Sequence, residues 1–382
     1  MSERNDFMSP NVFEETPFEE EQNEQDNGIS ELSKKGYQLL RENRVSEAVE
    51  CFAKILAVAE NNNYALVGMG DANRKQGVFR NAILFYQRCL DHHPGNNYAL
   101  FGMADCYKAL GQYSRAIEIW EQYLLHDDKN ITVLTRVADA YRKVRDYSRS
   151  KEVYLRVLEM DGQNPYAIIG LGHLHYDFKE YNAALACWEK IMDGNRKNVD
   201  IRVFTSIGNC HRKLKTFEKG LEYFRLALDK EPNNFYALFG MADCYRGMCH
   251  QERSLDFWNK ILAQDPRNKM ILTRAGDAYK TIGDYDKAVE CYNSALNVEF
   301  DTFAVLGLAM VDKLQGRFSE AIESLRRLIQ QDPRNYRFYL ELANCRLAKG
   351  EKREALEVLE EFQKQGIRNT AISKLMEKLK QA

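Results

Sequence analysis

The sequence of 382 residues has no uninterrupted apolar run of about 18 residues, the length that a membrane-spanning helix needs, so we expect no membrane insertion. It begins Met-Ser-Glu-Arg-Asn-Asp, without a basic segment followed by an apolar one, and we therefore expect no secretory signal. The nine cysteines are an odd number and include no Cys-x-x-Cys pair, which argues against a disulfide framework or a zinc ribbon. Together these features predict a cytoplasmic protein.

An excess of charge of one sign is also missing. There are 54 basic and 56 acidic residues, a formal net charge of −2, which argues against a general nucleic-acid binder. The sequence contains no His-Glu-x-x-His zinc motif, Walker phosphate loop or Gly-x-Ser-x-Gly elbow. His173 and His175 resemble a metal pair, but side chains two positions apart on a helix point in different directions. We therefore expect no enzymatic activity, no catalytic residue, no metal site and no cofactor.

Proline is scarce as well, with seven residues in the whole chain, and this favours helix. What the sequence does contain is a repeat. Residues 98–107 and 236–245 both read YALFGMADCY, and residues 64–71 read YALVGMGD, an earlier variant of the same motif. The step from Tyr64 to Tyr98 gives a period of about 34 residues, and Tyr236 follows Tyr98 by about four such periods. This spacing indicates that block 63–200 was duplicated as block 201–338.

This period divides the chain into a disordered acidic tail, a repeat array and a C-terminal capping helix. The predicted boundaries are 1–28 for the tail, 29–369 for the array and 370–382 for the capping helix. The ten predicted units are 29–62, 63–96, 97–130, 131–164, 165–200, 201–234, 235–268, 269–301, 302–335 and 336–369.

Residue size is restricted at fixed positions of the unit. Positions 8 and 20 are always Gly, Ala or Ser, so two helix backbones can approach closely there. Position 24 is always large and apolar: Phe52, Tyr86, Trp120, Tyr154, Trp188, Phe224, Trp258, Tyr292, Leu325 and Leu359. Proline stands at position 32 in four units and would end the second helix. Seven cysteines recur at positions 10 and 23, which predicts a packing role.

This ensemble of positions resembles the tetratricopeptide repeat family, whose unit is a 34-residue helix–turn–helix with small residues at positions 8 and 20 and proline at position 32. The resemblance covers about nine tenths of the chain. It implies an all-α, right-handed superhelical solenoid of about ten repeats, closed by a capping helix at the C-terminus.

The same resemblance implies a binding groove. In the family, the first helices line a concave face, and positions 2, 5, 9, 12 and 13 point into it. The predicted groove residues are Tyr64, Asp71, Arg74, Tyr98, Phe101, Asp105, Lys108, Asp139, Arg142, Asn209, Arg212, Tyr236, Phe239, Asp243, Arg246, Asp277 and Lys280. Among these residues, mostly acidic ones at position 9 and mostly basic ones at position 12 form an acid–base ladder along the groove. Two interpretations of this ladder stay open: ion pairs between residues i and i+3 of one helix, or a recognition strip in which aromatic residues anchor a ligand.

The predicted function is a non-enzymatic scaffold or adaptor that holds a peptide or helical segment of a partner protein in this groove. Two alternatives are an RNA-binding helical repeat, against which the near-neutral charge argues, and a regulatory subunit of an enzyme complex.

The first 28 residues carry nine acidic residues and one basic residue, which leaves a formal charge of +6 on the rest of the chain. Such a segment buries too little apolar surface to fold alone. It nevertheless contains Phe-Glu-Glu twice, at 13–15 and 18–20. The segment is either a solubilising tail or a short motif that docks in a basic groove, in its own chain or in a second copy, which would give self-association.

Overall fold

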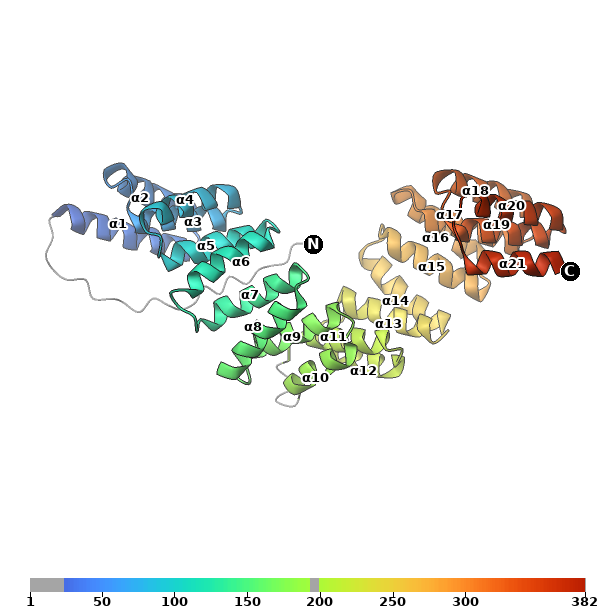
Figure 1. Ribbon diagram of the computed structural model, residues 1–382, viewed down its shortest axis with the longest axis horizontal. Coiled ribbons are helices and arrows are strands. Elements are labelled where there is room, and N and C mark those ends of the chain that lie inside the picture. The colour runs from blue at the N-terminus through green and yellow to red at the C-terminus, as the bar shows by residue number, and fades with distance from the viewer. Residues whose placement is uncertain (1–23, 193–198, 382) are drawn as a thin grey trace. The chain divides into compact units, whose positions relative to one another are not determined.

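The fold is described from a computed structural model, which describes residues 24–192 and 199–381. Over these residues every regular element is an α-helix and no strand occurs, which confirms the predicted all-α fold of helix–turn–helix repeats (Figure 1). Most of the predicted acidic tail lies outside the described residues.

The helices follow one another in pairs along the chain. Their bounds in the first half are α1 (Glu24–Arg41), α2 (Val45–Val58), α3 (Asn63–Lys75), α4 (Phe79–His92), α5 (Asn97–Ala109), α6 (Tyr113–Leu124), α7 (Ile131–Lys143), α8 (Tyr147–Met160), α9 (Pro165–Asp177) and α10 (Tyr181–Met192). Those in the second half are α11 (Ile201–Lys213), α12 (Phe217–Lys230), α13 (Phe235–Gly247), α14 (Gln251–Gln264), α15 (Lys269–Ile282), α16 (Tyr285–Val298), α17 (Thr302–Leu314), α18 (Phe318–Gln331), α19 (Tyr336–Ala348), α20 (Lys352–Lys364) and α21 (Thr370–Gln381).

The C-terminal boundary of the predicted disordered tail differs from the prediction. Helix α1 begins at Glu24, so residues 24–28 belong to a helix and not to a disordered tail. Ile29 and Leu32 of α1 pack against the core of the first hairpin. Once those residues nucleate the helix, each further residue adds a backbone hydrogen bond at little cost, and the helix extends towards the N-terminus.

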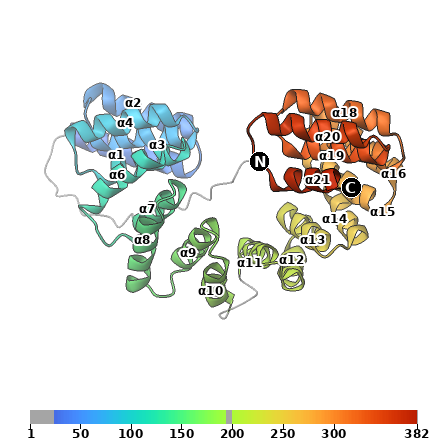
Figure 2. The same cartoon turned by 45° about the vertical axis from the view of Figure 1, so that its right-hand side comes forward.

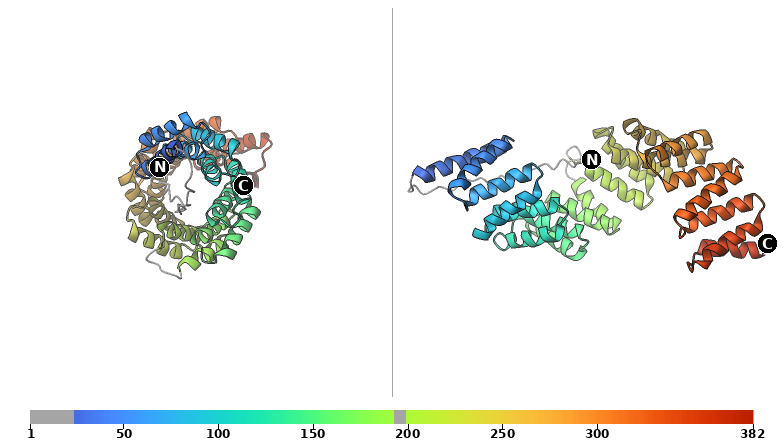
Figure 3. Two further views of the ribbon diagram at one scale, coloured as in Figure 1. Left: turned by 90° about the vertical axis from the view of Figure 1, so that its left-hand side faces the viewer. Right: turned by 90° about the horizontal axis from the view of Figure 1, so that it is seen from above.

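The chain forms two compact units, residues 1–170 and 171–382, and each is described by itself. From α1 to α8 in unit 1 and from α11 to α20 in unit 2, consecutive helices pack against each other as hairpins, and the second helix of a hairpin also contacts the first helix of the next (Figures 2 and 3). The first helices of successive hairpins also contact one another directly: α1 with α3 and α3 with α5 in unit 1, and α11 with α13 and α15 with α17 in unit 2. We call the face that these first helices share the first-helix surface.

Close backbone contact inside each hairpin occurs where the small residues were predicted. The Ser150 hydroxyl at position 20 donates a hydrogen bond to the Ala138 carbonyl at position 8, at 2.8 Å. The Ser254 hydroxyl bonds the Ala242 carbonyl in the same way at 2.9 Å. A larger side chain at either position would push the two helices apart.

The large residue at position 24 fills the space beside this contact. Every one of the ten residues there is almost completely buried. Five of the rings lie against a glycine at position 6 of the following unit: Gly68 by Phe52, Gly102 by Tyr86, Gly170 by Tyr154, Gly240 by Phe224 and Gly307 by Tyr292. Each ring therefore joins its own hairpin to the next one.

The turn between the two helices of each hairpin has one recurring conformation. Position 15 has a positive φ in all ten units: Asn43, Gly77, Gly111, Arg145, Lys179, Lys215, Cys249, Gly283, Gly316 and Gly350. This left-handed residue ends the first helix and lets its last carbonyls accept hydrogen bonds from the turn.

The N-terminal cap of the first helix also recurs from unit to unit. The side chains of Asn62, Asn96, Asn130, Asn234 and Asn268, at position 34, accept hydrogen bonds from backbone N–H groups in the first turn of the next helix. Such a cap contributes about 1 kcal/mol to helix stability.

The last helix packs on the end of unit 2. Ile372 and Met376 of α21 are buried in the same apolar cluster as Phe362 of α20 and Leu342 of α19. Helix α21 thus covers apolar side chains of the final hairpin that would otherwise face water.

Candidate functional site: the first-helix surface

Exposed aromatic residues stand at the start of the first helices. At position 2, Tyr64 and Tyr98 of unit 1 are 50% and 59% exposed, and Tyr236 and Phe303 of unit 2 are 69% and 65% exposed. Their positions follow directly from the Asn caps, because each aromatic residue lies two positions after a cap in α3, α5 and α13. Large rings in water are costly for a folded protein, and their recurrence at one register makes the surface a candidate binding site.

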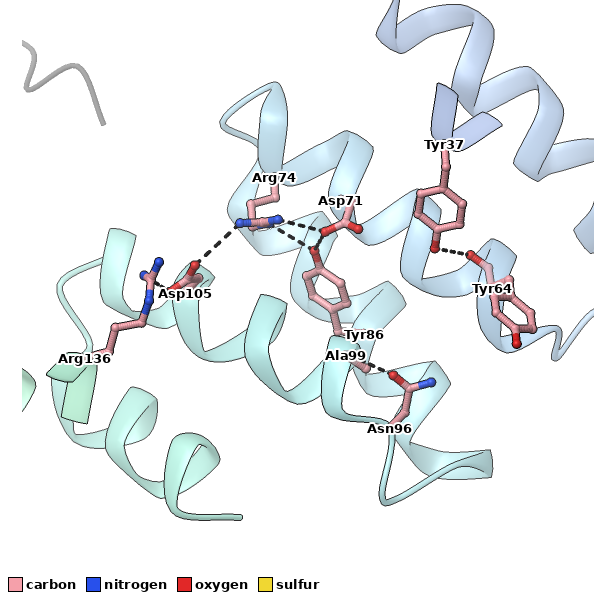
Figure 4. A network of polar contacts seen from close by, with 9 residues as sticks. All are labelled: Tyr37, Tyr64, Asp71, Arg74, Tyr86, Asn96, Ala99, Asp105 and Arg136. Carbon is pink, nitrogen blue, oxygen red and sulfur yellow. Dashed lines mark hydrogen bonds and ion pairs between the residues drawn. The ribbon is translucent and has the colours of Figure 1, made fainter. Parts of the chain in front are cut away.

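An acid–base network crosses the first helices of unit 1 (Figure 4). Asp105 of α5 lies between two guanidinium groups, 3.6 Å from Nη1 of Arg74 on α3 and 2.6 Å from Nη1 of Arg136 on α7. The Asp105 side chain is only 13% exposed, so its charge is largely compensated by these two cations. The network therefore runs across three successive hairpins.

Arg74 is held in place by two further groups. Its Nη2 lies 2.9 Å from Asp71, and the Tyr86 hydroxyl donates to the same Asp71 oxygen at 2.7 Å (Figure 4). Burial, together with the charge of Asp71, raises the pKa of the Tyr86 phenol well above its usual value, so Tyr86 stays a neutral donor. The buried ring at position 24 thus also orients the surface ladder.

A corresponding network occupies unit 2, at the equivalent positions of the duplicated block. Asp243 of α13 lies 2.5 Å from Arg212 of α11, 2.7 Å from Arg246 of its own helix and 3.5 Å from Arg274 of α15. Burial alone would raise the pKa of Asp243, but the hydrogen bonds and charges of Arg246 and Arg212 outweigh it and hold that pKa below its ordinary value. Asp243 is 7% exposed and acts by positioning the three cations.

Two differences distinguish the unit 2 network, and the first of them makes it more cationic. Asn209 replaces the carboxylate that Asp71 supplies in unit 1, and it accepts a hydrogen bond from Arg212 at 3.2 Å. Arg246 stands where unit 1 has Lys108. Three guanidinium groups then share one carboxylate. Burial, and the repulsion of Arg246 and Arg212, lower the pKa of Arg274 below its usual value even though Asp243 opposes this.

The remaining predicted pairs are contained within single helices. Arg142 bonds Asp139 at 2.6 Å, and Lys280 bonds Asp277 at 2.8 Å. The Tyr292 hydroxyl also donates to Asp277 at 2.8 Å, as Tyr86 does to Asp71. Pairing between residues i and i+3 is therefore present, and it coexists with the ladder between hairpins.

Phe101 and Phe239, at position 5, are partly buried under arginines. The Arg136 guanidinium carbon lies 4.9 Å from the centre of the Phe101 ring, and that of Arg274 lies 5.2 Å from the centre of the Phe239 ring. Each cation is thus fixed by a carboxylate and a ring.

The predicted groove residues are divided between the two units. Those in unit 1 are Tyr64, Asp71, Arg74, Tyr98, Phe101, Asp105, Lys108, Asp139 and Arg142. Those in unit 2 are Asn209, Arg212, Tyr236, Phe239, Asp243, Arg246, Asp277 and Lys280.

Sequence reasoning missed Arg136 and Arg274, which stand at position 6 and were not assigned to the groove. A signal for them exists in the sequence. Position 6 is glycine after a Phe or Tyr at position 24, whereas it is arginine after Trp120 and Trp258. Arg274 indeed lies over the Trp258 ring, 5.8 Å from its centre.

Several cysteines and one of the two histidines of the His173–His175 pair are buried. Cys106, Cys210 and Cys244 at position 10 are buried, and burial raises the pKa of each thiol to about 12, so they remain protonated and pack as apolar residues. His175 is buried with Nδ1 2.6 Å from Glu180. In the described part of the chain, no group of His, Cys, Asp and Glu could hold a metal ion. No helix within residues 24–192 and 199–381 has both the length and the apolar character that crossing a bilayer demands.

Comparison with known families identifies the repeat. Two models described as Tetratricopeptide repeat match the chain, one at residues 73–135 and 314–379 and the other at residues 131–164 and 271–302. The matches fall in both units, on the hairpins described above. The chain is a tetratricopeptide repeat protein. A search of curated proteins gave no significant match.

Solved structures similar to this tetratricopeptide repeat protein include other repeat proteins. PilF of Pseudomonas aeruginosa aligns with a TM-score of 0.47 and 13% identity over 56% of this chain and 97% of its own. A tetratricopeptide repeat protein from Parabacteroides merdae aligns with a TM-score of 0.42 and 16% identity over 75% and 99%. YrrB, described as a TPR protein with an unusual peptide-binding site, aligns with a TM-score of 0.41 and 21% identity over 49% and 95%.

Proposed function

We propose that this tetratricopeptide repeat protein is a non-catalytic scaffold that binds an extended or helical segment of a partner protein on its first-helix surface. Repeats of this family are in general interaction modules, and the function follows from what the surface offers a ligand. The observation that carries the proposal is the row of exposed position-2 aromatics beside cations that are already held in place.

The physical basis is preorganisation. Side-chain ordering costs about 0.5–1.5 kcal/mol for each flexible group immobilised on binding. Arg136, Arg212 and Arg274 are fixed by carboxylates before any ligand arrives, and Arg136 and Arg274 also lie over rings, so most of that cost falls in folding and not in binding. The exposed rings then supply apolar contact area. We propose a cytoplasmic location for the same protein, because an odd number of cysteines without a Cys-x-x-Cys pair does not suit the disulfide framework of a secreted protein.

The test is affinity capture from the native cell with a surface variant of the intact chain. Tyr98→Ala, Lys108→Glu and Tyr236→Ala change groups of the surface without removing a residue that compensates Asp105 or Asp243. We expect this variant to lose the captured protein while keeping the helical circular dichroism of the wild type.

A matched control is Arg80→Glu with Arg326→Glu, because both residues are exposed on second helices, α4 and α18. Unchanged capture by the surface variant, or equal loss in the control, would refute the proposal. Capture that disappears on ribonuclease treatment would instead favour the RNA-binding alternative. An enzyme that co-purifies stably would make the scaffold a regulatory subunit.

A further inference from the structure

One cation of the first-helix surface is unpaired. Position 12 carries Arg74, Lys108, Arg142, Arg246 and Lys280 among other cations, and four of these five bond the carboxylate three positions earlier in the same helix. Among the residues that the structure describes, the Lys108 ammonium has no hydrogen bond or ion pair. The reason is that its own acidic neighbour, Asp105, is turned to Arg74 and Arg136.

Exposed and half-buried rings stand on the helix that carries this cation and on the neighbouring first helix. Tyr98 and Phe101 belong to the same helix, α5, and Tyr64 stands at the equivalent position of the neighbouring α3. Tyr64 and Tyr98 are at least half exposed. We call the group Tyr64, Tyr98, Phe101, Lys108 and Arg136 the Lys108 surface. It combines apolar rings with an ammonium that has no acidic partner, and it therefore suits an aromatic side chain next to carboxylates.

The charges of the Lys108 surface and its neighbours also favour an acidic ligand. Arg74, Lys108 and Arg136 carry three positive charges, and Asp71 and Asp105 carry two negative ones. Both carboxylates are engaged with the arginines, so the uncompensated charge belongs to Lys108. An approaching carboxylate gains most from that group, because paired charges attract little at a distance.

The chain itself carries a segment of this chemistry. Residues 1–23 contain seven acidic residues and one basic residue, a formal charge of −6 against +4 for the remainder. Within them Phe13 and Phe18 each precede two glutamates. Aromatic and acidic side chains therefore stand next to each other in the segment. On the surface, a helical rise of about 1.5 Å per residue separates Lys108 from Phe101 by about 10 Å and from Tyr98 by about 15 Å along α5, distances that a bound segment can span.

The segment is also long enough. It ends at Glu24, the first residue of α1, in the same compact unit as the Lys108 surface. Helix α1 contacts α3 and α3 contacts α5, and packed helices lie about 8–10 Å apart, so α5 is roughly 20 Å from α1. An extended chain spans about 3.3 Å per residue, so Phe18, six residues before Glu24, reaches only about 20 Å, whereas Phe13, eleven residues before Glu24, reaches about 36 Å. Phe13 and the two glutamates after it can therefore reach α5.

We propose that residues 1–23 dock within their own chain on the Lys108 surface, with Phe13 against the aromatic rings and Glu14 and Glu15 directed to Lys108. The segment then occupies part of the surface that receives a partner, so it competes with partner binding. This inference rests on the proposed function of the first-helix surface.

The experiment places p-benzoylphenylalanine at position 13 of the full-length chain and maps the cross-links formed on irradiation by peptide mass spectrometry. We expect cross-links to α3, α5 and α7 within the monomer, at a yield independent of protein concentration. Raising the salt to about 0.5 M should reduce the yield, because exposed charges are then screened.

Three charge-reversal variants are compared, one at Lys108 and two as controls. Lys108→Glu should abolish these cross-links. Arg246→Glu, at the equivalent position of the duplicated block, and Arg80→Glu, on a second helix of unit 1, should leave them unchanged. Cross-links scattered over the chain, unaffected by Lys108→Glu, or found only between chains would overturn the proposal.

The outcome can be separated from that of the proposed function. If the surface variant loses its partner in the capture experiment while position 13 cross-links at random, the scaffold function holds and tail docking fails. If cross-links map to the Lys108 surface while capture is insensitive to the surface variant, tail docking holds and the scaffold function fails.

Discussion

Gly240 has no room for a side chain. A Cβ atom added there would lie 2.2 Å from the Phe224 ring of the preceding hairpin, well inside contact distance. The glycines at position 6 therefore reflect space taken by a ring, not a need for an unusual backbone, because they lie within helices. A single missing methyl group sets how closely one hairpin approaches the next.

We expect Gly240→Ala to lower the free energy of unfolding by about 1–3 kcal/mol, the usual cost of overpacking a tight core. Gly28→Ala is the control, because a Cβ atom at Gly28 in α1 meets nothing within 4 Å, and better helix propensity should leave stability unchanged or slightly higher. Urea unfolding followed by circular dichroism measures both. Adding Phe224→Leu to Gly240→Ala should recover part of the loss, and a failure to do so would show that the ring is not the cause.

His211 should make unit 2 sensitive to mild acid. Its Nδ1 lies 2.9 Å from the Thr216 hydroxyl, and its ring stacks on Tyr223. Burial, and then the charge of Lys219, lower the pKa of His211 below 6.5. The unfolded chain therefore binds the proton more readily than the folded one, and stability falls as the pH drops below 6.5 towards the folded-state pKa.

The expected result is that His211→Gln loses less stability than the wild type between pH 7 and pH 5. Thermal unfolding of both proteins across this range tests it, because all other titrating groups are shared. Parallel pH profiles would contradict the assignment.

At the level of the helices, the hairpin turn uses one backbone conformation with two kinds of residue. Gly283 has a φ of 90° and Lys215 a φ of 61° at the same position of the unit. A residue with a Cβ atom is strained there by about 1–2 kcal/mol, whereas glycine is not. The turn geometry is thus imposed by the packing of the two helices, and only some units carry the residue that suits it best.

Lys215→Gly should therefore raise the free energy of unfolding by about 0.5–1 kcal/mol, the relief of strain less the added freedom of the unfolded chain. Gly283→Ala should lower it by about 1 kcal/mol. Chemical denaturation of the two single variants measures the pair. The same sign for both changes would mean that position 15 does not determine the turn.

Across the whole chain, stability should be local, because each hairpin contacts mainly its neighbours. Trp120 in unit 1 and Trp258 in unit 2 occupy equivalent positions of the duplicated block, and both are completely buried. Replacing either tryptophan by alanine therefore makes the same change in the core of one unit at a time.

We expect Trp258→Ala to cost about 3–5 kcal/mol locally and to accelerate amide hydrogen exchange in α13, α14 and α15 while α3 and α4 stay protected. Trp120→Ala should give the converse pattern, with faster exchange in α5, α6 and α7. Uniform acceleration along the chain in either variant would show that the two units unfold as one.

The hairpins could be predicted from the sequence because their determinants are local and periodic. Small residues at positions 8 and 20 and a bulky one at position 24 recur in every unit, and the Asn caps that were overlooked recur in many of them. The ion-pair partners could not be predicted in the same way. Helical spacing pairs Asp105 with Lys108, yet Asp105 bonds Arg136 and faces Arg74, which lie on the neighbouring first helices α7 and α3.

The sequence by itself determined the period, the helix pairs and which residues are buried. Only the tertiary structure decided which cations remain available, since that depends on distances between helices that spacing along the chain does not specify. A nearly buried carboxylate takes the partners that rigid packing brings within reach, and in unit 1 those were two arginines, which left Lys108 unpaired.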